Sequence, residues 1–266
     1  MNINGKNIPF SFSQNRLYGD CPRKYKFRYV DNIVEPTNDN LELGSAIHKL
    51  FECLEHIIRD YTYNYTQPIR EFVESYIDSS AAKEYSDAMK TILTLKTQDY
   101  LDRLTSAWLE WHKDKKIIAC ENRLEFDDFV AIIDVTYQRP DGTYVLGDYK
   151  VTKKPKTISS VYSEGQLLLY KYMYNQVYNI PPEMIEVEYV NVYSSVTPKL
   201  ITTVNDNPDI QECLSLWKST KITKQKILNG DFPKNRKWCN WCYYKDMCTN
   251  CLLYTSDAAD EARSVD

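Results

Sequence analysis

The chain has 266 residues, of which 43% are hydrophobic and 26% are charged, and its formal net charge is −4. This length and apolar content are enough to bury a core in one domain, or in one domain with an added lobe. No apolar run reaches the roughly 18 residues that a membrane-spanning helix needs, and the N-terminus lacks an apolar signal core. We therefore expect a cytoplasmic protein that does not contact a membrane.

The C-terminal residues 251–266, "CLLYTSDAADEARSVD", differ in composition from the aromatic, lysine-rich sequence before them. We interpret them as a translated sequencing adapter and predict no fold for them; a native acidic tail is the alternative. Without them the cysteines fall from eight to seven, and the net charge becomes −1 because the tail carries four acidic residues and one arginine. The natural chain is then expected to continue past Asn250.

The first half of the chain is predicted to be helical. The segment "SFSQNRLYGDCPRKYKFRYV" indicates a short helix that begins near Ser11 or Ser13 with a hydroxyl cap, and a second helical segment after Pro22. Residues 41–60 place their apolar side chains at the spacing of a helix with one buried face. The same periodicity, without strand-like alternation, continues through residues 61–115, which we predict to form a helical lobe.

The second half alternates strands with helices. Three β-rich runs, "IIACENRLEFD", "FVAIIDVTYQ" and "TYVLGDYKVT", come first, and the turn sequence "RPDGT" joins the last two as a hairpin. The elements expected after them are a helix at 159–179, strands at 184–195 and 199–204, a helix at 209–230 that Gly230 ends, and a cysteine-rich segment at 236–250. This order predicts an α/β fold in one domain over residues 1–250, with the helical lobe as an insertion.

The predicted hairpin carries charged residues at positions that converge. Asp148 and Lys150 are two residues apart on one strand, so their side chains share a face, and the hairpin brings Asp134 of the other strand beside them. Two converging carboxylates can hold a hard divalent cation, and a lysine on the same side can position a water nucleophile or stabilise an oxyanion. This is the equipment of metal-assisted phosphodiester hydrolysis. Ordinary surface alternation with a stray salt bridge explains the spacing about equally well.

The pattern D-x13-D-x-K across a hairpin resembles the signature of PD-(D/E)xK nucleases. Asp134 would be the first acid, Asp148 would hold the D/E position, and Lys150 would be the lysine. A further motif resembles the RecB-type exonuclease branch of that superfamily. "GSAIHKLFE" is similar to the N-terminal helical motif of that branch, whose histidine is a metal ligand and corresponds here to His48.

A third motif, "GQLLLYKYMY", is similar to the Q-x-x-x-Y helix of the same branch. It implies that Gln166 and Tyr170, one helical turn apart, lie near the active site and the substrate backbone. The resemblance covers most of residues 11–248 except the helical lobe, and it implies a restriction-endonuclease-like core, in which helices flank a mixed central sheet. There are two departures: Ala131 stands where the family often has glycine, and position 148 holds aspartate rather than the commoner glutamate.

Other acidic and imidazole side chains are weaker candidates. Glu121, on the strand before Asp134, could support the metal indirectly or could form a surface pair. His56 and His112 match no motif, and a lone helical histidine is usually structural.

Three cysteines gather in "CNWCYYKDMC" with the spacing C-x2-C-x5-C. One RecB-type subgroup holds an iron–sulfur cluster with this C-terminal triplet and one N-terminal cysteine, which implies the ligand set Cys21, Cys239, Cys242 and Cys248. Four thiolates can take either a [4Fe–4S] cluster or Zn²⁺, and the spacing does not separate the two. Such a site would clamp the two ends of the chain together. Small buried side chains are the expected role of the cysteines without spaced partners, Cys53, Cys120 and Cys213.

We therefore expect a metal-dependent DNA nuclease, and specifically an exonuclease on single-stranded or end-containing DNA, in recombination or repair. The implied ligands of Mg²⁺ or Mn²⁺ are His48, Asp134, Asp148 and the backbone carbonyl of Val151. Because the net charge is near zero, DNA contacts must come from local basic segments, with Arg23, Lys24 and the run 153–156 as candidates. No G-x-x-x-x-G-K-[ST] segment is present, so a partner helicase or recombination protein would be a separate chain.

Two other functions fit parts of the sequence. A catalytically silent nuclease-like subunit could recognise DNA within a recombination or CRISPR complex, but the retention of His48, Lys150 and both acids argues against it. A zinc-clamped scaffold without a nucleic-acid role would leave the acidic hairpin unexplained.

Overall fold

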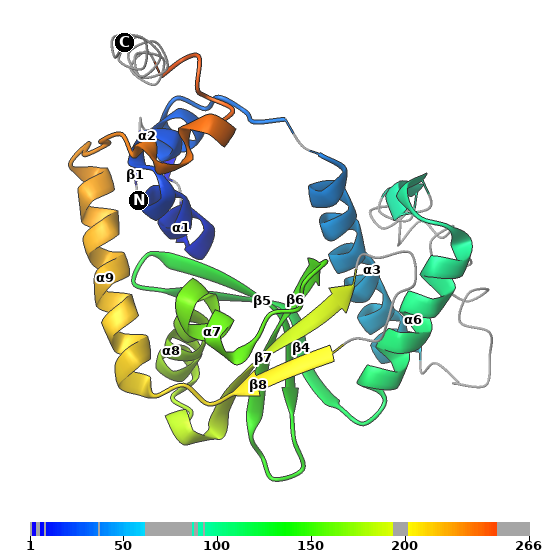
Figure 1. Cartoon of the computed structure of the whole chain (residues 1–266). Coiled ribbons are helices and arrows are strands. Elements are labelled where there is room, and N and C mark those ends of the chain that lie inside the picture. The colour runs from blue at the N-terminus through cyan, green and yellow to red at the C-terminus, as the bar shows by residue number, and fades with distance from the viewer. Residues whose placement is uncertain are drawn as a thin grey trace, which may run out of the picture. The chain divides into compact units, whose positions relative to one another are not determined.

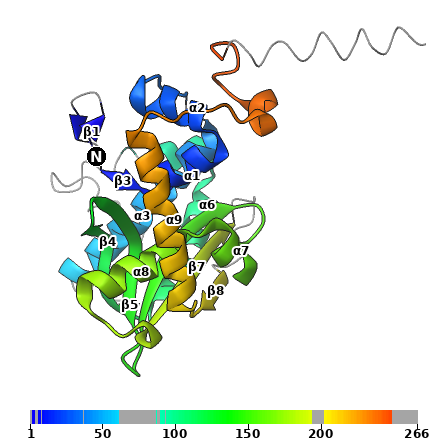
Figure 2. The same ribbon diagram turned by 90° about the vertical axis from the view of Figure 1, so that its left-hand side faces the viewer.

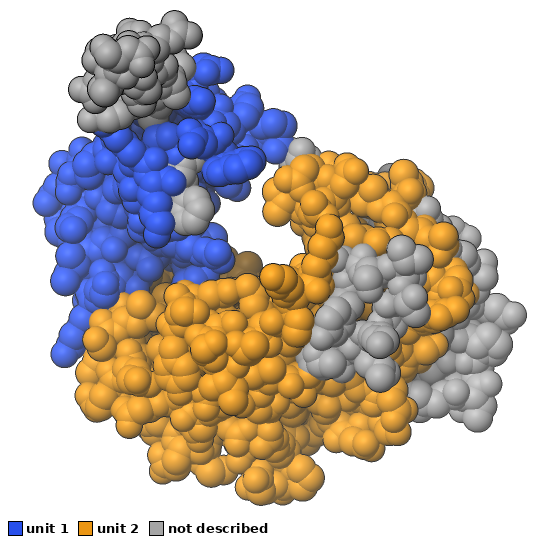
Figure 3. Space-filling view, viewed as in Figure 1, with its two compact units in different colours: residues 1–36, 218–266 blue, residues 37–217 orange. Residues whose placement is uncertain are grey.

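The structure is a computed structural model that describes residues 2–3, 6–7, 9–36, 38–61, 87, 90–92, 94–193 and 202–248. Contacts divide the chain into two compact units, coloured separately in Figure 3. Unit 1 comprises residues 1–36 and 218–266, and unit 2 comprises residues 37–217. This division does not test the expected single domain over residues 1–250, which stays a prediction. Much of the predicted helical lobe, residues 62–86, and the tail at 251–266 lie outside the described residues.

Unit 2 is built on a mixed β-sheet. Its strands are β4 (Lys116–Phe126), β5 (Phe129–Gln138), β6 (Tyr144–Thr152), β7 (Ile185–Tyr193) and β8 (Thr202–Asp206). They pair in that order: β6 and β7 are parallel, and the other neighbouring strands are antiparallel. The three β-rich runs and the hairpin are confirmed, and Gly142 in the hairpin turn has a φ of 89° that favours glycine.

Helices cover the two faces of this sheet (Figures 1 and 2). On one face lie α3 (Asp39–Tyr61) and α6 (Gln98–His112), and on the other lie α7 (Ile158–Glu164) and α8 (Gln166–Tyr178). The aromatic core between the sheet and the first pair of helices includes Phe51 stacked on Trp108, with ring centroids 5.8 Å apart, and Phe51 against Tyr149 at 4.7 Å. These aromatic side chains pack α3 and α6 against one face of β6.

Two local predictions were wrong. The single helix expected at 159–179 is two helices, because Gly165 between them has a φ of 77° and a Cβ there would lie 2.7 Å from Leu216 Cδ2. The first helix, α1 (Phe12–Asp20), begins after Ser11 as expected, but no side-chain hydrogen bond caps it. The Ser11 hydroxyl instead lies 3.0 Å from the hydroxyl of Ser13.

Unit 1 joins segments from both ends of the sequence. Its elements are α1, α2 (Pro22–Tyr25), a π-helical turn at Lys26–Val30, a 3-10 helix at Arg236–Trp241, the short strands β1 (Asn2–Ile3), β2 (Lys6–Asn7) and β3 (Phe10–Ser11), and the end of α9 (Ile210–Leu228). Among the described residues, no helix is both long enough and apolar enough to cross a membrane.

Hydrogen bonds hold these distant segments of unit 1 together. The Arg23 amide donates to the Pro233 carbonyl at 3.1 Å, and the Asn235 side chain donates to the Asp20 carbonyl at 2.8 Å. The ring of Tyr25 also stacks on that of Phe232, with centroids 6.1 Å apart. The two hydrogen bonds lie on either side of Cys21, so they fix this cysteine against the segment that leads into the C-terminal cysteines.

Candidate functional site

The two predicted acids lie where β5 and β6 separate. Backbone pairing between these strands runs from Gln138 with Tyr144 to Val135 with Gly147 and stops there, so that Asp134 and Asp148 come directly after the last pair. The Asp134 carboxylate then replaces a strand partner: its Oδ2 accepts a hydrogen bond of 2.7 Å from the Tyr149 amide. This bond holds a buried carboxylate in the gap between the two strands.

His48 reaches the same carboxylate from α3. Its Nδ1 lies 3.4 Å from Asp134 Oδ2, and its ring stands edge-on to Tyr149, with centroids 5.9 Å apart. Burial works to lower the pKa of His48, but the hydrogen bond to Asp134 and the nearby negative charge outweigh it, so the pKa is raised above its ordinary value. The motif prediction that joined this histidine to the acidic hairpin therefore describes a real proximity.

The amide of Gln166 connects Asp148 with Lys150. Gln166 Nε2 donates to Asp148 Oδ1 at 2.7 Å and to the Tyr170 hydroxyl at 2.7 Å, and Gln166 Oε1 accepts from Lys150 Nζ at 2.9 Å. A carboxylate only accepts and an ammonium only donates, so these partners fix which end of the amide faces which side chain. Gln166 thus binds both Asp148 and Lys150 and also contacts Tyr170, while the roles of Gln166 and Tyr170 in an active site stay predictions.

Asp148 and Lys150 form a buried ion pair. Lys150 Nζ lies 2.5 Å from Asp148 Oδ2, and the carboxylate is only 2% exposed. Burial raises the pKa of Asp148 to about 6; Lys150 opposes the rise and the neighbouring Asp134 adds to it. Burial also disfavours the charge on Lys150, but the attraction of Asp148 prevails and the pKa of the lysine is raised. Each group therefore favours the charged form of the other.

Tyr149, between Asp148 and Lys150 on β6, was not singled out from the sequence. Its side chain points to the opposite face of the sheet, where Trp108 Nε1 donates to its hydroxyl at 3.3 Å. It thus ties α6 to the strand whose amide holds Asp134. A large aromatic residue between two charged residues on one strand was the signal for this role, since alternation predicts one buried face.

Val151, named as a backbone ligand, lies further along the same strand. Its side chain packs with the core on the α3 side of the sheet, and it pairs with Val192 of β7. The backbone group that contacts Asp134 belongs to Tyr149 rather than to Val151. The metal-ligand role of the Val151 carbonyl stays a prediction.

Glu121 interacts electrostatically with Asp134, which makes it a better candidate for the site than the sequence alone indicated. It lies on β4 between Cys120 and Asn122, whose partners on β5 flank Asp134, and its φ of 48° is unusual for a residue other than glycine. Burial, and after it the charges of Asp134 and Glu52, raise its pKa to about 7. The carboxyl group therefore belongs to the electrostatic surroundings of the first acid.

Two other histidines were expected to be structural. His112 does have a partner that no motif indicated: its Nε2 lies 3.2 Å from Glu55 Oε2, and its ring stacks on Trp108 with centroids 4.7 Å apart. Glu55 and His112 are both buried between α3 and α6. This pair links the two helices on the His48 side of the sheet, so it supports the site without entering it.

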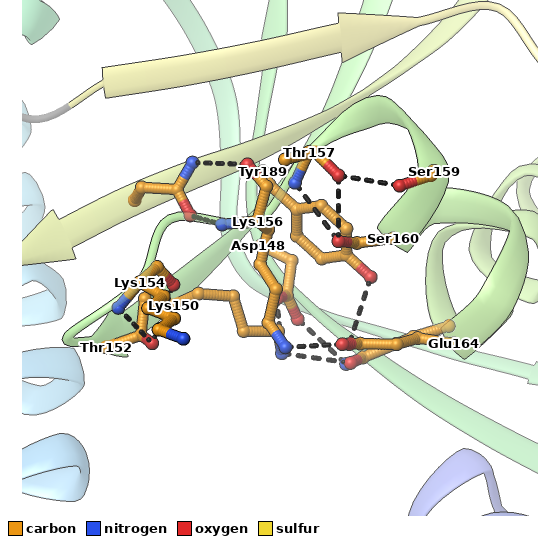
Figure 4. A network of polar contacts seen from close by, with 12 residues as sticks. Asp148, Lys150, Thr152, Lys154, Lys156, Thr157, Ser159, Ser160, Glu164 and Tyr189 are labelled. Atoms are coloured by element: carbon orange, nitrogen blue, oxygen red, sulfur yellow. Dashed lines mark hydrogen bonds and ion pairs between the residues drawn. The ribbon is translucent and has the colours of Figure 1, made fainter.

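Hydrogen bonds and an ion pair hold part of the basic run after β6 in place (Figure 4). Asn191, fully buried, binds both backbone groups of Lys156: its Oδ1 accepts from the amide at 2.7 Å and its Nδ2 donates to the carbonyl at 3.2 Å. The Lys156 ammonium pairs with Glu164, while Lys153 and Lys154 are exposed. The loop is therefore anchored at Lys156 and presents the two preceding lysines.

Comparison with known proteins assigns this geometry to a family. The sequence model of the PD-(D/E)XK nuclease superfamily matches residues 9–249 of the chain. The chain belongs to this superfamily. The restriction-endonuclease-like fold predicted from the sequence is confirmed, and so is the predicted nuclease superfamily. The catalytic roles of Asp134, Asp148 and Lys150 stay predictions.

Solved structures agree with the fold of this nuclease. A candidate exonuclease from Eubacterium rectale is 13% identical, with 97% of this chain and 94% of that chain covered and a TM-score of 0.51. At this identity the likeness concerns the fold alone. A second structure, SSO0001, is 12% identical over 85% of this chain and 94% of that chain, and its TM-score of 0.31 carries no argument. No curated protein matches the chain.

The donor set of the nuclease suits a hard divalent cation. Two carboxylates and an imidazole converge, and Lys150, Gln166 and His48 each interact favourably with the buried charge of Asp148. Within the described ranges, no group of three or more His, Cys, Asp or Glu side chains is arranged to hold an ion as it stands.

The four cysteines of the predicted cluster lie in unit 1 around one pocket. Cys21, Cys239, Cys242 and Cys248 all line this cavity of about 340 Å³. Tyr244, between the last two, donates its hydroxyl to the Ile33 carbonyl at 2.8 Å, which ties the C-terminal segment to the N-terminal one. The cysteines expected to be outside the cluster do not line the pocket; Cys53 and Cys213 are buried, and the half-buried Cys120 donates its thiol to the Asp134 carbonyl. Four thiols around one cavity fit a metal or cluster in chemistry.

The raised pKa of Glu121 predicts a stability that depends on pH. Its folded pKa of about 7 exceeds the ordinary 4.5, so its ionisation costs the folded state stability above about pH 7, and this cost vanishes below the ordinary pKa. Glu121→Gln should therefore raise the free energy of unfolding at about pH 8 and leave it unchanged at about pH 4, measured by urea denaturation without divalent cations. The matched control is Glu125→Gln on the same strand, an exposed carboxylate paired with Arg123, which should have little effect at either pH. Equal stabilisation by Glu121→Gln at both pH values would contradict the titration.

Proposed function

We propose that this nuclease is a metal-dependent DNA exonuclease that acts on single-stranded or end-containing DNA. The observation that carries the proposal is the meeting of Asp134, Asp148 and Lys150 where β5 and β6 separate, with His48 at 3.4 Å from the first acid. Superfamily membership supports hydrolysis of phosphodiester bonds. Preference for ends follows from the RecB-type resemblance of the His48 and Gln166 motifs.

In the proposed reaction, some groups of the protein would hold the metal ion and Lys150 would act on the water and the phosphate. His48, Asp134, Asp148 and the Val151 carbonyl would hold Mg²⁺ or Mn²⁺, which supplies an activated water and neutralises charge on the scissile phosphate when bound. Lys150 remains charged at neutral pH because its pKa is raised. Once it releases Asp148 Oδ2, it can orient the attacking water and balance the charge that develops on the phosphate oxygens.

Gln166 and Tyr170 complete the proposed site. The amide of Gln166 holds one oxygen of Asp148 and the ammonium of Lys150 in fixed positions, which is a positioning role. The hydroxyl of Tyr170 is fixed by the same amide, and its pKa is far above the ordinary value because of burial and the charge of Asp148, so it stays protonated. A protonated hydroxyl can donate to a phosphate oxygen, which fits the proposed contact with the DNA backbone.

We further propose that Cys21, Cys239, Cys242 and Cys248 hold a structural [4Fe–4S] cluster, with Zn²⁺ as the alternative. The shared pocket in unit 1 and the two hydrogen bonds beside Cys21 support it. The proposed gain is stability, since the cofactor would join segments from opposite ends of the sequence.

Loss of one acid tests the catalytic site. Asp148→Ala should reduce Mg²⁺-dependent DNA degradation by on the order of 1,000-fold or more, because it removes a ligand and leaves Lys150 without its counter-ion. Lys150→Ala should lose on the order of 100-fold but still bind Mn²⁺ in calorimetry, because lysine supplies no ligand. The control is Asp99→Ala, an exposed carboxylate of α6 paired with Arg103, which should keep full activity. A folded Asp148→Ala protein with wild-type activity would remove the assignment.

The requirement for ends is tested with two single-stranded substrates of the same sequence. An end-labelled linear strand should be shortened progressively, while the ligated circular strand should survive much longer, because an exonuclease needs a terminus. The measurement is product length on denaturing gels over time. Equal rates on both substrates would show an endonuclease and contradict the exonuclease proposal while leaving the acidic site in place.

The cofactor is tested by purification without oxygen. The protein should be brown, with about four iron and four acid-labile sulfide per chain; colourless protein with one zinc would keep the clamp and change the metal. Cys21→Ala should lose the cofactor as completely as Cys239→Ala and should unfold at a lower temperature. The matched controls Cys53→Ala, Cys120→Ala and Cys213→Ala should retain it. Retention in Cys21→Ala together with loss in one of the controls would show that the fourth ligand is wrong.

A further inference from the structure

Positive charge is concentrated in unit 1. The whole chain has a net charge of −4, yet residues 218–248 contain eight lysines and arginines against two acids, and residues 9–36 contain five against three. Sequence reasoning had noted only the second of these segments as basic. A domain-sized excess of one sign within an acidic protein attracts polyanions over distances of about a Debye length. The charge therefore indicates a polyanionic partner for this unit.

A large aromatic side chain stands at the surface of the same unit. Trp241 is 88% exposed, which exceeds the exposure of every other large hydrophobic side chain in the described part of the chain. Transfer of an indole ring from water to an apolar interior is strongly favourable in free energy, so a highly exposed tryptophan is unusual. Tyr243, two residues later, is 47% exposed. The exposed aromatic side chains follow directly on the basic sequence "KNRK" at 234–237.

The basic and aromatic side chains share one surface. Trp241 lines the same pocket as Arg16, Arg23 and Lys234, with Asp20 as the acid among them. Arg16 is exposed, as is Arg236 on the 3-10 helix that leads to Trp241. The pocket lining is therefore mixed, with the apolar side chains of Leu17 and Phe27 beside the cations. This combination matches single-stranded nucleic acid, whose bases stack on aromatic faces while its phosphates pair with Lys and Arg.

We propose that this basic aromatic surface of unit 1, formed by Arg16, Lys234, Arg236, Lys237 and Trp241, binds single-stranded DNA. Trp241 stacks on a base, and the cations contact the flanking phosphates. The inference rests on the proposed function in taking DNA as the polyanion, but it assigns binding to a surface that contains none of the catalytic residues. Because an indole can stack on any base, the surface binds without sequence preference.

The test measures binding separately from cleavage. Asp148→Asn protein, with its cofactor and without added divalent cations, is titrated into fluorescein-labelled oligo-dT and into an abasic strand of the same length. Trp241→Ala should weaken oligo-dT binding by about 10-fold and leave the abasic strand nearly unchanged, because only bases can stack. The matched control is Tyr178→Ala, an exposed aromatic residue of unit 2, which should change neither.

The phosphate contacts are tested by charge removal. The triple variant Lys234→Ala, Arg236→Ala, Lys237→Ala should weaken binding to both strands and flatten the dependence of log affinity on log salt by about 2. Its control removes three exposed cations of unit 2, Lys90, Lys113 and Arg123, and so makes the same change in net charge. That control should keep the wild-type salt dependence.

Several results would overturn the inference. Unchanged oligo-dT affinity in Trp241→Ala, or equal losses on the oligo-dT and abasic strands, would exclude stacking. Loss of iron or zinc in Trp241→Ala would show a structural role instead, and Trp241-dependent binding to anionic phosphatidylserine vesicles but not to DNA would identify a membrane surface. Failure of the nuclease proposal is separate, because it would show as full activity of Asp148→Ala whatever the binding data are.

Discussion

The close approach of β5 and β6 at Val135 and Gly147 is the constraint on which the site depends. A Cβ at Gly147 would lie 2.6 Å from Val135 Cγ1, so a larger residue there would force the Val135 side chain to move. Directly beyond this pair the strands stop pairing, and the Asp134 side chain becomes the partner of the Tyr149 amide. The two carboxylates are therefore buried at the point where pairing in the hairpin ends.

Burial then determines the electrostatics of these carboxylates. Asp148 is almost fully inaccessible, and its raised pKa shows that the surroundings resist its charge. The ion pair with Lys150 and the bond to Gln166 compensate that charge without a metal. In the proposed function, a divalent cation would compete with Lys150 for the same oxygen, so metal binding would release the lysine. The ammonium group would then reach the reacting phosphate only when the cation is in place.

The face of the sheet that α3 and α6 cover holds the backbone of the site in position. Tyr149 carries contacts from α3 and α6 to the backbone that holds Asp134, and the buried Glu55–His112 pair joins the same two helices. His48 on α3 depends on this packing for its position beside Asp134. In unit 1 the corresponding support is the set of hydrogen bonds that flank Cys21 and bring both chain ends to one pocket. Unit 1 is also where the positive charge of an acidic chain is concentrated, which is the basis of the binding role that we propose for it.

Local patterns in the sequence were enough to predict the strands, the hairpin turn and the shared face of Asp148 and Lys150, because each depends on residues close together in the chain. The break at Gly165 was missed because it depends on Leu216, which is distant in sequence. The partners of Gln166 and His112 and the strained backbone of Glu121 were likewise set by packing between elements, which no local period records. The sequence by itself was enough to predict which residues would carry the chemistry. Only the tertiary structure decided how they meet, because burial and long-range contacts fix which oxygen, amide or ammonium each of them faces.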